Sequence, residues 1–181
     1  MYIWVGIDVD DQLGGIKAAA QKAENSIGFA HSNFTLPFHI SLKISFYIDD
    51  SLSRTVKDTV MGIYKDTKPF EVSVKGIEHH DEIVWIRMAE SDEMRILHDK
   101  LNDVLFDRFG IGLHPYDTDY KFHTTLFMDD DIEKVQKAYE MVKNVPLPTT
   151  LHIGKFLIGM SPEGALGTYK VIEEVTPEIG A

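Results

Sequence analysis

Two short segments of the chain each place a histidine two positions before a hydroxyl-bearing residue. Segment 38–42 reads FHISL, and segment 122–126 reads FHTTL. In a β-strand, residues i and i+2 point to the same face of the sheet. His39 therefore shares a face with Ser41, and His123 shares one with Thr125. The flanking phenylalanine and leucine residues point to the opposite face, toward a core.

Two histidines and two hydroxyls around one point are suited to in-line displacement at phosphorus without a metal ion. Imidazoles with a pKa near 6.5 can hold opposite protonation states at neutral pH. One ring then accepts a proton from the nucleophile while the other protonates the leaving oxygen. We predict that His39 and His123 are catalytic and that Ser41 and Thr125 bind the phosphate. Acyl transfer fits poorly, because no acidic residue is placed to orient either histidine and no nucleophile elbow is present.

The hydropathy pattern predicts alternating strands and helices along the whole chain. The expected strands span residues 2–9, 38–48, 71–76, 83–88, 120–128, 151–160 and 168–175, and the expected helices span 11–26, 50–65, 92–109 and 131–144. The order strand, helix, strand, helix, strand occurs twice, and each motif lies on the second strand of its unit. This pattern predicts an α+β duplication within one domain, 1–181, with lobes at about 1–78 and 83–175 that face each other across a groove.

The paired motifs resemble those of the 2H phosphoesterase superfamily, which includes 2′-5′ RNA ligase-like proteins and 2′,3′-cyclic nucleotide phosphodiesterases. The matching residues are His39-Ile40-Ser41-Leu42 and His123-Thr124-Thr125-Leu126. The resemblance implies a bilobal, pseudo-symmetric fold in which each lobe is a mainly antiparallel sheet with helices outside. It also implies that each lobe contributes one motif strand to a central groove, and that no cofactor is needed. The implied role is in RNA processing, on 2′,3′-cyclic phosphates or 2′-5′ phosphodiesters.

The source of positive charge for an anionic substrate is less obvious. The second motif runs into an acidic segment, 129–131, which departs from many relatives and which we expect to turn away as a helix N-cap. Lys43, on the His39 face by alternation, and Lys121, on the His123 face, are the best local candidates for substrate contacts. Tyr116, in the preceding loop, could stack on a base. Either lysine could equally be a solvated strand residue, and for Tyr116 an ordinary loop position is the favoured interpretation.

Composition limits the partners of the chain. It has 181 residues, no cysteine, and 18 Lys+Arg against 29 Asp+Glu, which gives a formal net charge of −11. Because lysine and arginine contacts to phosphates supply most of the affinity for long nucleic acid, that class of partner is disfavoured. The absence of cysteine excludes disulfides, thiolate catalysis and cysteine-ligated zinc. The apolar runs are too short to span a membrane. We expect a cytoplasmic monomer that acts on small nucleotides or short RNA.

Three classes of function remain open. The first is a phosphoesterase, for which the sequence does not decide which histidine is the base; run in reverse, the same site would be an RNA 2′-5′ ligase. The second is a non-catalytic module that binds a nucleotide in the same groove. The third and weakest is a metal hydrolase that uses histidines and the many aspartates.

Overall fold

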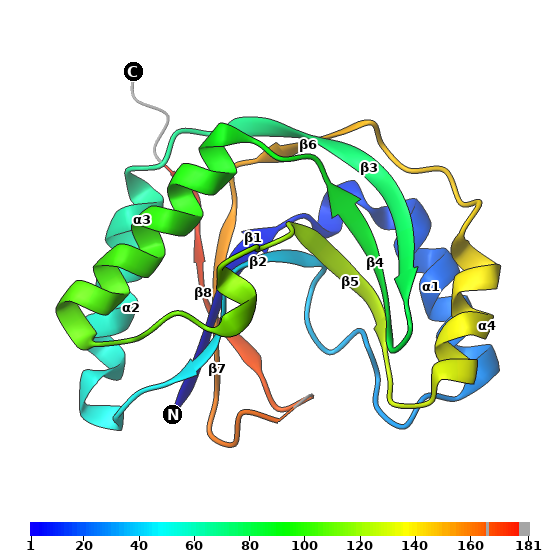
Figure 1. Ribbon diagram of the computed structural model, residues 1–181, viewed down its shortest axis with the longest axis horizontal. Coiled ribbons are helices and arrows are strands. Elements are labelled where there is room, and N and C mark those ends of the chain that lie inside the picture. The colour runs from blue at the N-terminus through cyan, green and yellow to red at the C-terminus, as the bar shows by residue number, and fades with distance from the viewer. Residues whose placement is uncertain (166, 178–181) are drawn as a thin grey trace.

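The computed structural model describes residues 1–165 and 167–177, which form two four-stranded antiparallel sheets and four α-helices (Figure 1). The first sheet has the order β2-β1-β7-β8, with β1 (Tyr2–Asp8), β2 (His39–Tyr47), β7 (Phe156–Ser161) and β8 (Lys170–Val175). The second has the order β5-β4-β3-β6, with β3 (Phe70–His80), β4 (Ile83–Met88), β5 (His123–Met128) and β6 (Thr150–Ile153). The expected α+β class with antiparallel sheets is confirmed.

The helices pack in two pairs on the outer sides of the sheets (Figure 1). They are α1 (Gly14–Ile27), α2 (Ser53–Lys65), α3 (Asp92–Phe109) and α4 (Ile132–Val142). Helices α2 and α3 contact each other and the first sheet, through β8 and β2 respectively. Helix α4 contacts β4 and β5 of the second sheet and packs against α1. Within the described residues, no helix is both long enough and apolar enough to cross a membrane.

Polar caps and left-handed residues set the ends of several helices. Ser91 Oγ accepts a hydrogen bond from the Met94 backbone N–H at 3.2 Å at the start of α3. At the start of α4, Asp131 Oδ1 accepts from the Lys134 N–H at 3.2 Å, so the acidic run after the second motif does cap a helix. Helix α3 ends at Gly110, whose φ of 68° is readily adopted only by glycine. These local signals were predictable from the sequence.

The predicted division into lobes at 1–78 and 83–175 is wrong, because each sheet combines strands from both halves of the chain. Strand β3 joins β4 in the second sheet, and the C-terminal strands β7 and β8 join β1 in the first. The expected strand 151–160 is in fact two strands, β6 and β7, that pair with β3 and β1 respectively. The break falls at Gly154-Lys155, so a glycine and a lysine separate the buried residues of β6 from those of β7.

The two motif strands have one face in the core and one face that is partly exposed. Ile40 and Leu42 of β2 and Leu126 of β5 are fully buried. The motif histidines and hydroxyl residues on the opposite faces are only half-buried; they are His39, Ser41, His123 and Thr125. Although β2 and β5 belong to different sheets, they contact each other (Figure 1). The fold therefore brings the two motifs to adjoining strands.

Candidate active site

The two motif histidines are anchored in the same way. His39 Nδ1 lies 2.8 Å from the backbone carbonyl oxygen of Pro37, and His123 Nδ1 lies 2.6 Å from that of Lys121. Because a carbonyl oxygen can only accept, each Nδ1 must carry a hydrogen and donate it. In the neutral ring, Nε2 is then the free nitrogen, available to accept a proton or, once protonated, to donate one. Each ring donates to the carbonyl two residues before it in the chain, so the two motifs repeat the same side-chain hydrogen bond.

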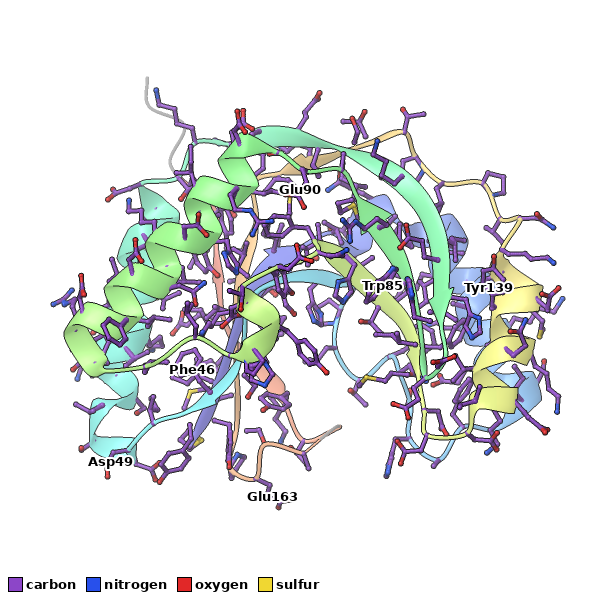
Figure 2. All side chains as sticks on the ribbon, viewed as in Figure 1. Phe46, Asp49, Trp85, Glu90, Tyr139 and Glu163 are labelled. Atoms are coloured by element: carbon purple, nitrogen blue, oxygen red, sulfur yellow. The ribbon has the colours of Figure 1, made fainter. Side chains whose placement is uncertain are left out.

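A tryptophan from the neighbouring strand packs on each histidine. The ring centroids of Trp4, on β1, and His39 are 4.2 Å apart at 70°. Figure 2 labels the second tryptophan, Trp85, on β4 of the second sheet. The ring centroids of Trp85 and His123 are also 4.2 Å apart, at 34°. Each histidine is therefore held by a backbone carbonyl on one side and an indole on the other. Two fixed contacts on each ring restrict its rotation and keep Nε2 in a defined direction.

Several contacts link the two motifs across the junction of the sheets. The positive charge of His123 acts on His39 and lowers its pKa. Tyr120, three residues before His123, has a buried hydroxyl that interacts with Ser41 of the other motif. The Tyr120 ring also packs on His123, with centroids 6.2 Å apart. One tyrosine thus contacts Ser41 of the first motif and His123 of the second.

Burial makes His39 difficult to protonate. Desolvation lowers the pKa of His39 from 6.5 to about 4, and repulsion from His123 adds to this effect. The Pro37 carbonyl and the charge of Asp8 oppose it. His39 is therefore neutral at pH 7 in the free protein and suited to accept a proton.

The pKa of His123 is also lowered, chiefly by burial and further by the positive charges of Arg87 and His80. The Lys121 carbonyl and the carboxylate of Glu78 oppose that shift. An anionic phosphate bound between the two rings would stabilise imidazolium and raise both pKa values. The two histidines are therefore easier to protonate in the substrate complex than in the free protein.

Arg87 places a positive charge beside His123 that was not predicted from the sequence. It pairs with His123 across the β4–β5 ladder, and its guanidinium donates from Nε to the Met88 carbonyl at 3.2 Å. Alternation along β4 buries Val84 and Ile86 and leaves Arg87 on the opposite face, together with Trp85. That alternation is visible in the sequence. The pairing with His123 is not, because it depends on the register between β4 and β5, and the two residues are 36 positions apart.

Lys43 does not occupy the place predicted for it. The ammonium group is buried, with 1% of the residue exposed, where it forms an ion pair with Asp117 and donates to the Gly112 carbonyl at 3.1 Å. The prediction that Lys43 contacts substrate is therefore wrong. The physical reason is an irregularity in the β1–β2 pairing between Val5↔Lys43 and Gly6↔Ser41, which interrupts simple alternation just after the motif.

The other two predicted substrate contacts lie near the surface. The backbone carbonyl of Lys121 accepts a hydrogen bond from His123, while its ammonium group lies 3.8 Å from the Asp119 carboxylate. Tyr116 is 72% exposed, and its ring packs on His114 at 5.1 Å between centroids. A role for either side chain in substrate binding stays a prediction. Within the described residues, no group of three or more histidine, cysteine, aspartate or glutamate side chains is arranged to hold a metal ion.

Comparisons with known proteins identify the family and support the fold. The family model of the 2′-5′ RNA ligase superfamily matches residues 16–158, and a search of curated protein sequences found no match. Among solved structures, TT0787 of Thermus thermophilus is 15% identical, with 98% of this chain and 100% of that chain covered and a TM-score of 0.64. E. coli LigT complexed with 3′-AMP is 13% identical, with 97% and 96% covered and a TM-score of 0.59. At these identities the two structures share the fold. With a family match that extends over most of its length and includes both motifs, the chain belongs to the 2′-5′ RNA ligase superfamily of 2H phosphoesterases.

Proposed function

We propose that the protein is a metal-independent phosphoesterase that hydrolyses 2′,3′-cyclic phosphates or 2′-5′ phosphodiesters of nucleotides or short RNA. The observation that carries this proposal is the matched anchoring of His39 and His123. Both rings donate from Nδ1 to a carbonyl and keep Nε2 free, and they lie on contacting strands close enough for their charges to interact. A free base and a free acid at one site are what displacement at phosphorus requires.

The lower pKa supports His39 as the general base for hydrolysis. His39 Nε2 takes a proton from water, the water oxygen attacks phosphorus, and the bond from phosphorus to a ribose oxygen breaks. His123, protonated on Nε2, gives its proton to that leaving oxygen. Ser41 and Thr125 donate to the nonbridging oxygens, and the charge of Arg87 offsets the negative charge of the phosphate. In the reverse direction the two histidines exchange roles.

The size and charge of the substrate follow from two observations. A net charge of −11 disfavours long nucleic acid, since each phosphate would need a compensating cation. The structurally similar E. coli LigT has been crystallised with 3′-AMP, a small nucleotide that carries its phosphate on a ribose oxygen. Both observations support a small nucleotide or the end of a short RNA as the substrate.

The direct test is hydrolysis of the four nucleoside 2′,3′-cyclic phosphates and of a 2′-5′ dinucleotide with EDTA present. We expect turnover of at least one substrate that EDTA does not reduce. Loss of activity with EDTA would favour a metal hydrolase, and saturable binding without turnover would favour a binding module. Joining of an RNA 2′,3′-cyclic phosphate end to a 5′-hydroxyl, without net hydrolysis, would favour the ligase reaction.

The pH dependence of kcat/KM should be bell-shaped, with its maximum on the acidic side of neutrality. This parameter reports the free enzyme, in which the base must be neutral and the acid protonated. The rate should rise with pH through the pKa of His39, about 4, and fall again through the lowered pKa of His123, below 6.5. The two limbs belong to the coupled pair. Because bound phosphate raises both pKa values, the optimum of kcat should lie at higher pH. A kcat/KM that rises steadily from pH 5 to 9 would instead indicate attack by hydroxide or by metal-bound water.

Removing one motif hydroxyl should have a moderate effect. Ser41→Ala or Thr125→Val removes a hydrogen bond to an anionic phosphate oxygen but leaves the proton path intact. Such a charge-assisted bond is worth roughly 1.5–3 kcal/mol, so kcat/KM should fall by about 10–150-fold. Steady-state kinetics on the folded variants measure this loss. If Ser41→Ala were as inactive as a histidine variant, the serine would be a nucleophile and the assigned roles would be wrong.

A further inference from the structure

Each of the two tryptophans of the chain packs on one motif histidine, but their indole N–H groups donate to different kinds of partner. Trp4 Nε1 donates to Ser41 Oγ at 3.0 Å, so it contacts the hydroxyl of the same motif whose histidine it covers. Trp85 Nε1 donates instead to the carboxylate of Glu78, at 2.9 Å. Within the described part of the chain, the Thr125 hydroxyl makes no hydrogen bond to another protein group. The duplicated site is therefore asymmetric at its hydroxyls.

Two glycines make room for the Trp4 indole in the first sheet: Gly159, its partner on β7, and Gly6, two residues further along β1. A Cβ atom at Gly159, on β7, would lie 2.5 Å from Trp4 Cε3. A Cβ atom at Gly6, on β1, would lie 3.0 Å from Trp4 Cζ2. Only 6% of Trp4 is exposed. With no side chain at either glycine, the indole lies close to the sheet, and the direction of its N–H is set by packing.

The fixed Trp4 N–H limits the directions in which the Ser41 hydroxyl can donate its hydrogen. An indole nitrogen only donates, so Ser41 Oγ must accept from it, and the hydrogen of Ser41 cannot point toward Trp4. Among the described residues, the other group that interacts with Ser41 is the Tyr120 hydroxyl, and this hydrogen bond acts to lower the pKa of Tyr120, which is the effect of Ser41 donating to the tyrosine oxygen. A hydroxyl that accepts a hydrogen bond is also polarised and becomes a better donor. The arrangement therefore favours Ser41 as a donor to a phosphate oxygen.

We propose that Trp4 is a positioning residue that, through its N–H, holds Ser41 as the main hydroxyl donor to the phosphate. This inference rests on the proposed phosphoesterase function. Trp4 acts through Ser41, whereas Trp85, which donates elsewhere, acts only by packing. The Ser41 donor is consequently stronger than the Thr125 donor, and Ser41→Ala should cost more activity than Thr125→Val.

The test is a double-mutant cycle between Trp4 and Ser41. Trp4 is replaced by phenylalanine and, separately, by benzothienylalanine, an isostere in which sulfur replaces the indole N–H. Each replacement is made in the native chain and in Ser41→Ala. We expect the benzothienylalanine variant to lower kcat/KM about three- to tenfold in the native chain, mainly through kcat, and to have no further effect in Ser41→Ala. Its pH limbs should not move, because its ring still packs on His39 as the indole does. Phenylalanine also loses ring contact with His39, so the part of its effect that remains in Ser41→Ala measures that packing. Trp85→Phe is the matched comparison, and its effect should be equal in both backgrounds.

Three results would overturn the inference. Full activity of the benzothienylalanine variant would show that Trp4 acts only by its shape. An equal loss in Ser41→Ala would show that Trp4 does not act through the serine. In the benzothienylalanine variant, a shift of the limb assigned to His39 would show that Trp4 acts through the histidine. The same cycle is measured by calorimetric binding of adenosine 3′-monophosphate. If the native protein turned over no substrate, the proposed function would fail, while the binding cycle would still decide the role of Trp4.

Discussion

Alanine at either His39 or His123 is expected to lower kcat/KM for a nucleoside 2′,3′-cyclic phosphate by about 10²–10⁴-fold. Each replacement removes one of the two proton transfers while leaving the hydroxyls to bind phosphate. The double variant should be scarcely worse than either single variant, since groups that act as a unit are not additive. Residual activity of His39→Ala should also lose its acidic limb, because that limb reports the neutral form of His39. Initial rates across pH measure all three outcomes.

The matched control is His152→Ala. His152 is an exposed histidine on β6, and its backbone, not its side chain, holds Gln12. We expect native activity from this variant and an unchanged thermal transition for all of the histidine variants. Near-native turnover by folded His39→Ala would contradict the two-histidine mechanism.

Of the single substitutions proposed here, replacement of one partner of the buried Lys43–Asp117 pair should lower the free energy of unfolding the most. Lys43→Met leaves the Asp117 carboxylate buried with the His114 backbone N–H at 2.7 Å as its remaining donor, and its Oδ1 has no partner among the described residues. Removing one member of a buried ion pair typically costs 3–5 kcal/mol, so we expect a loss of about that size in the free energy of unfolding. Urea denaturation at pH 7 measures it.

Two further variants separate the pair from its individual members. Lys43→Met/Asp117→Asn removes both charges and should recover part of the loss. Lys57 and Glu173 form a partly exposed pair at 2.7 Å, and Lys57→Met should cost no more than about 1 kcal/mol. If Lys43→Met were as stable as the native protein, the carboxylate of Asp117 would have to be solvated, and the buried pair would not exist in solution.

The sequence predicts what depends on neighbours along the chain. Alternation places His39 with Ser41 and His123 with Thr125, and both pairs do lie on the partly exposed faces of β2 and β5. Helix α3 begins after Ser91, as its capping pattern indicates. In these cases the controlling interaction lies within four residues, so the local pattern contains it.

Features that depend on register between distant strands could not be predicted. Trp4 reaches Ser41 across 37 residues, and Lys43 reaches Asp117 across 74. The irregular pairing beside Lys43 and the transfer of the chain from β6 to β7 both arise from the arrangement of the sheets. Lys43 lies in a segment that alternates as an ordinary strand would, and Gly154-Lys155 interrupts the apolar run without indicating that the two strands join different sheets.

A crystal structure of the protein with a nucleoside 2′- or 3′-monophosphate would show whether the two histidines act on one phosphate. The proposed mechanism predicts that Nε2 of His39 and Nε2 of His123 both lie within about 2.6–3.2 Å of oxygens of the same phosphate. The two Nε2 atoms should then be on the order of 5–8 Å apart, with the hydroxyls of Ser41 and Thr125 on the nonbridging oxygens. A phosphate bound by only one of the histidines, or bound away from both, would contradict it.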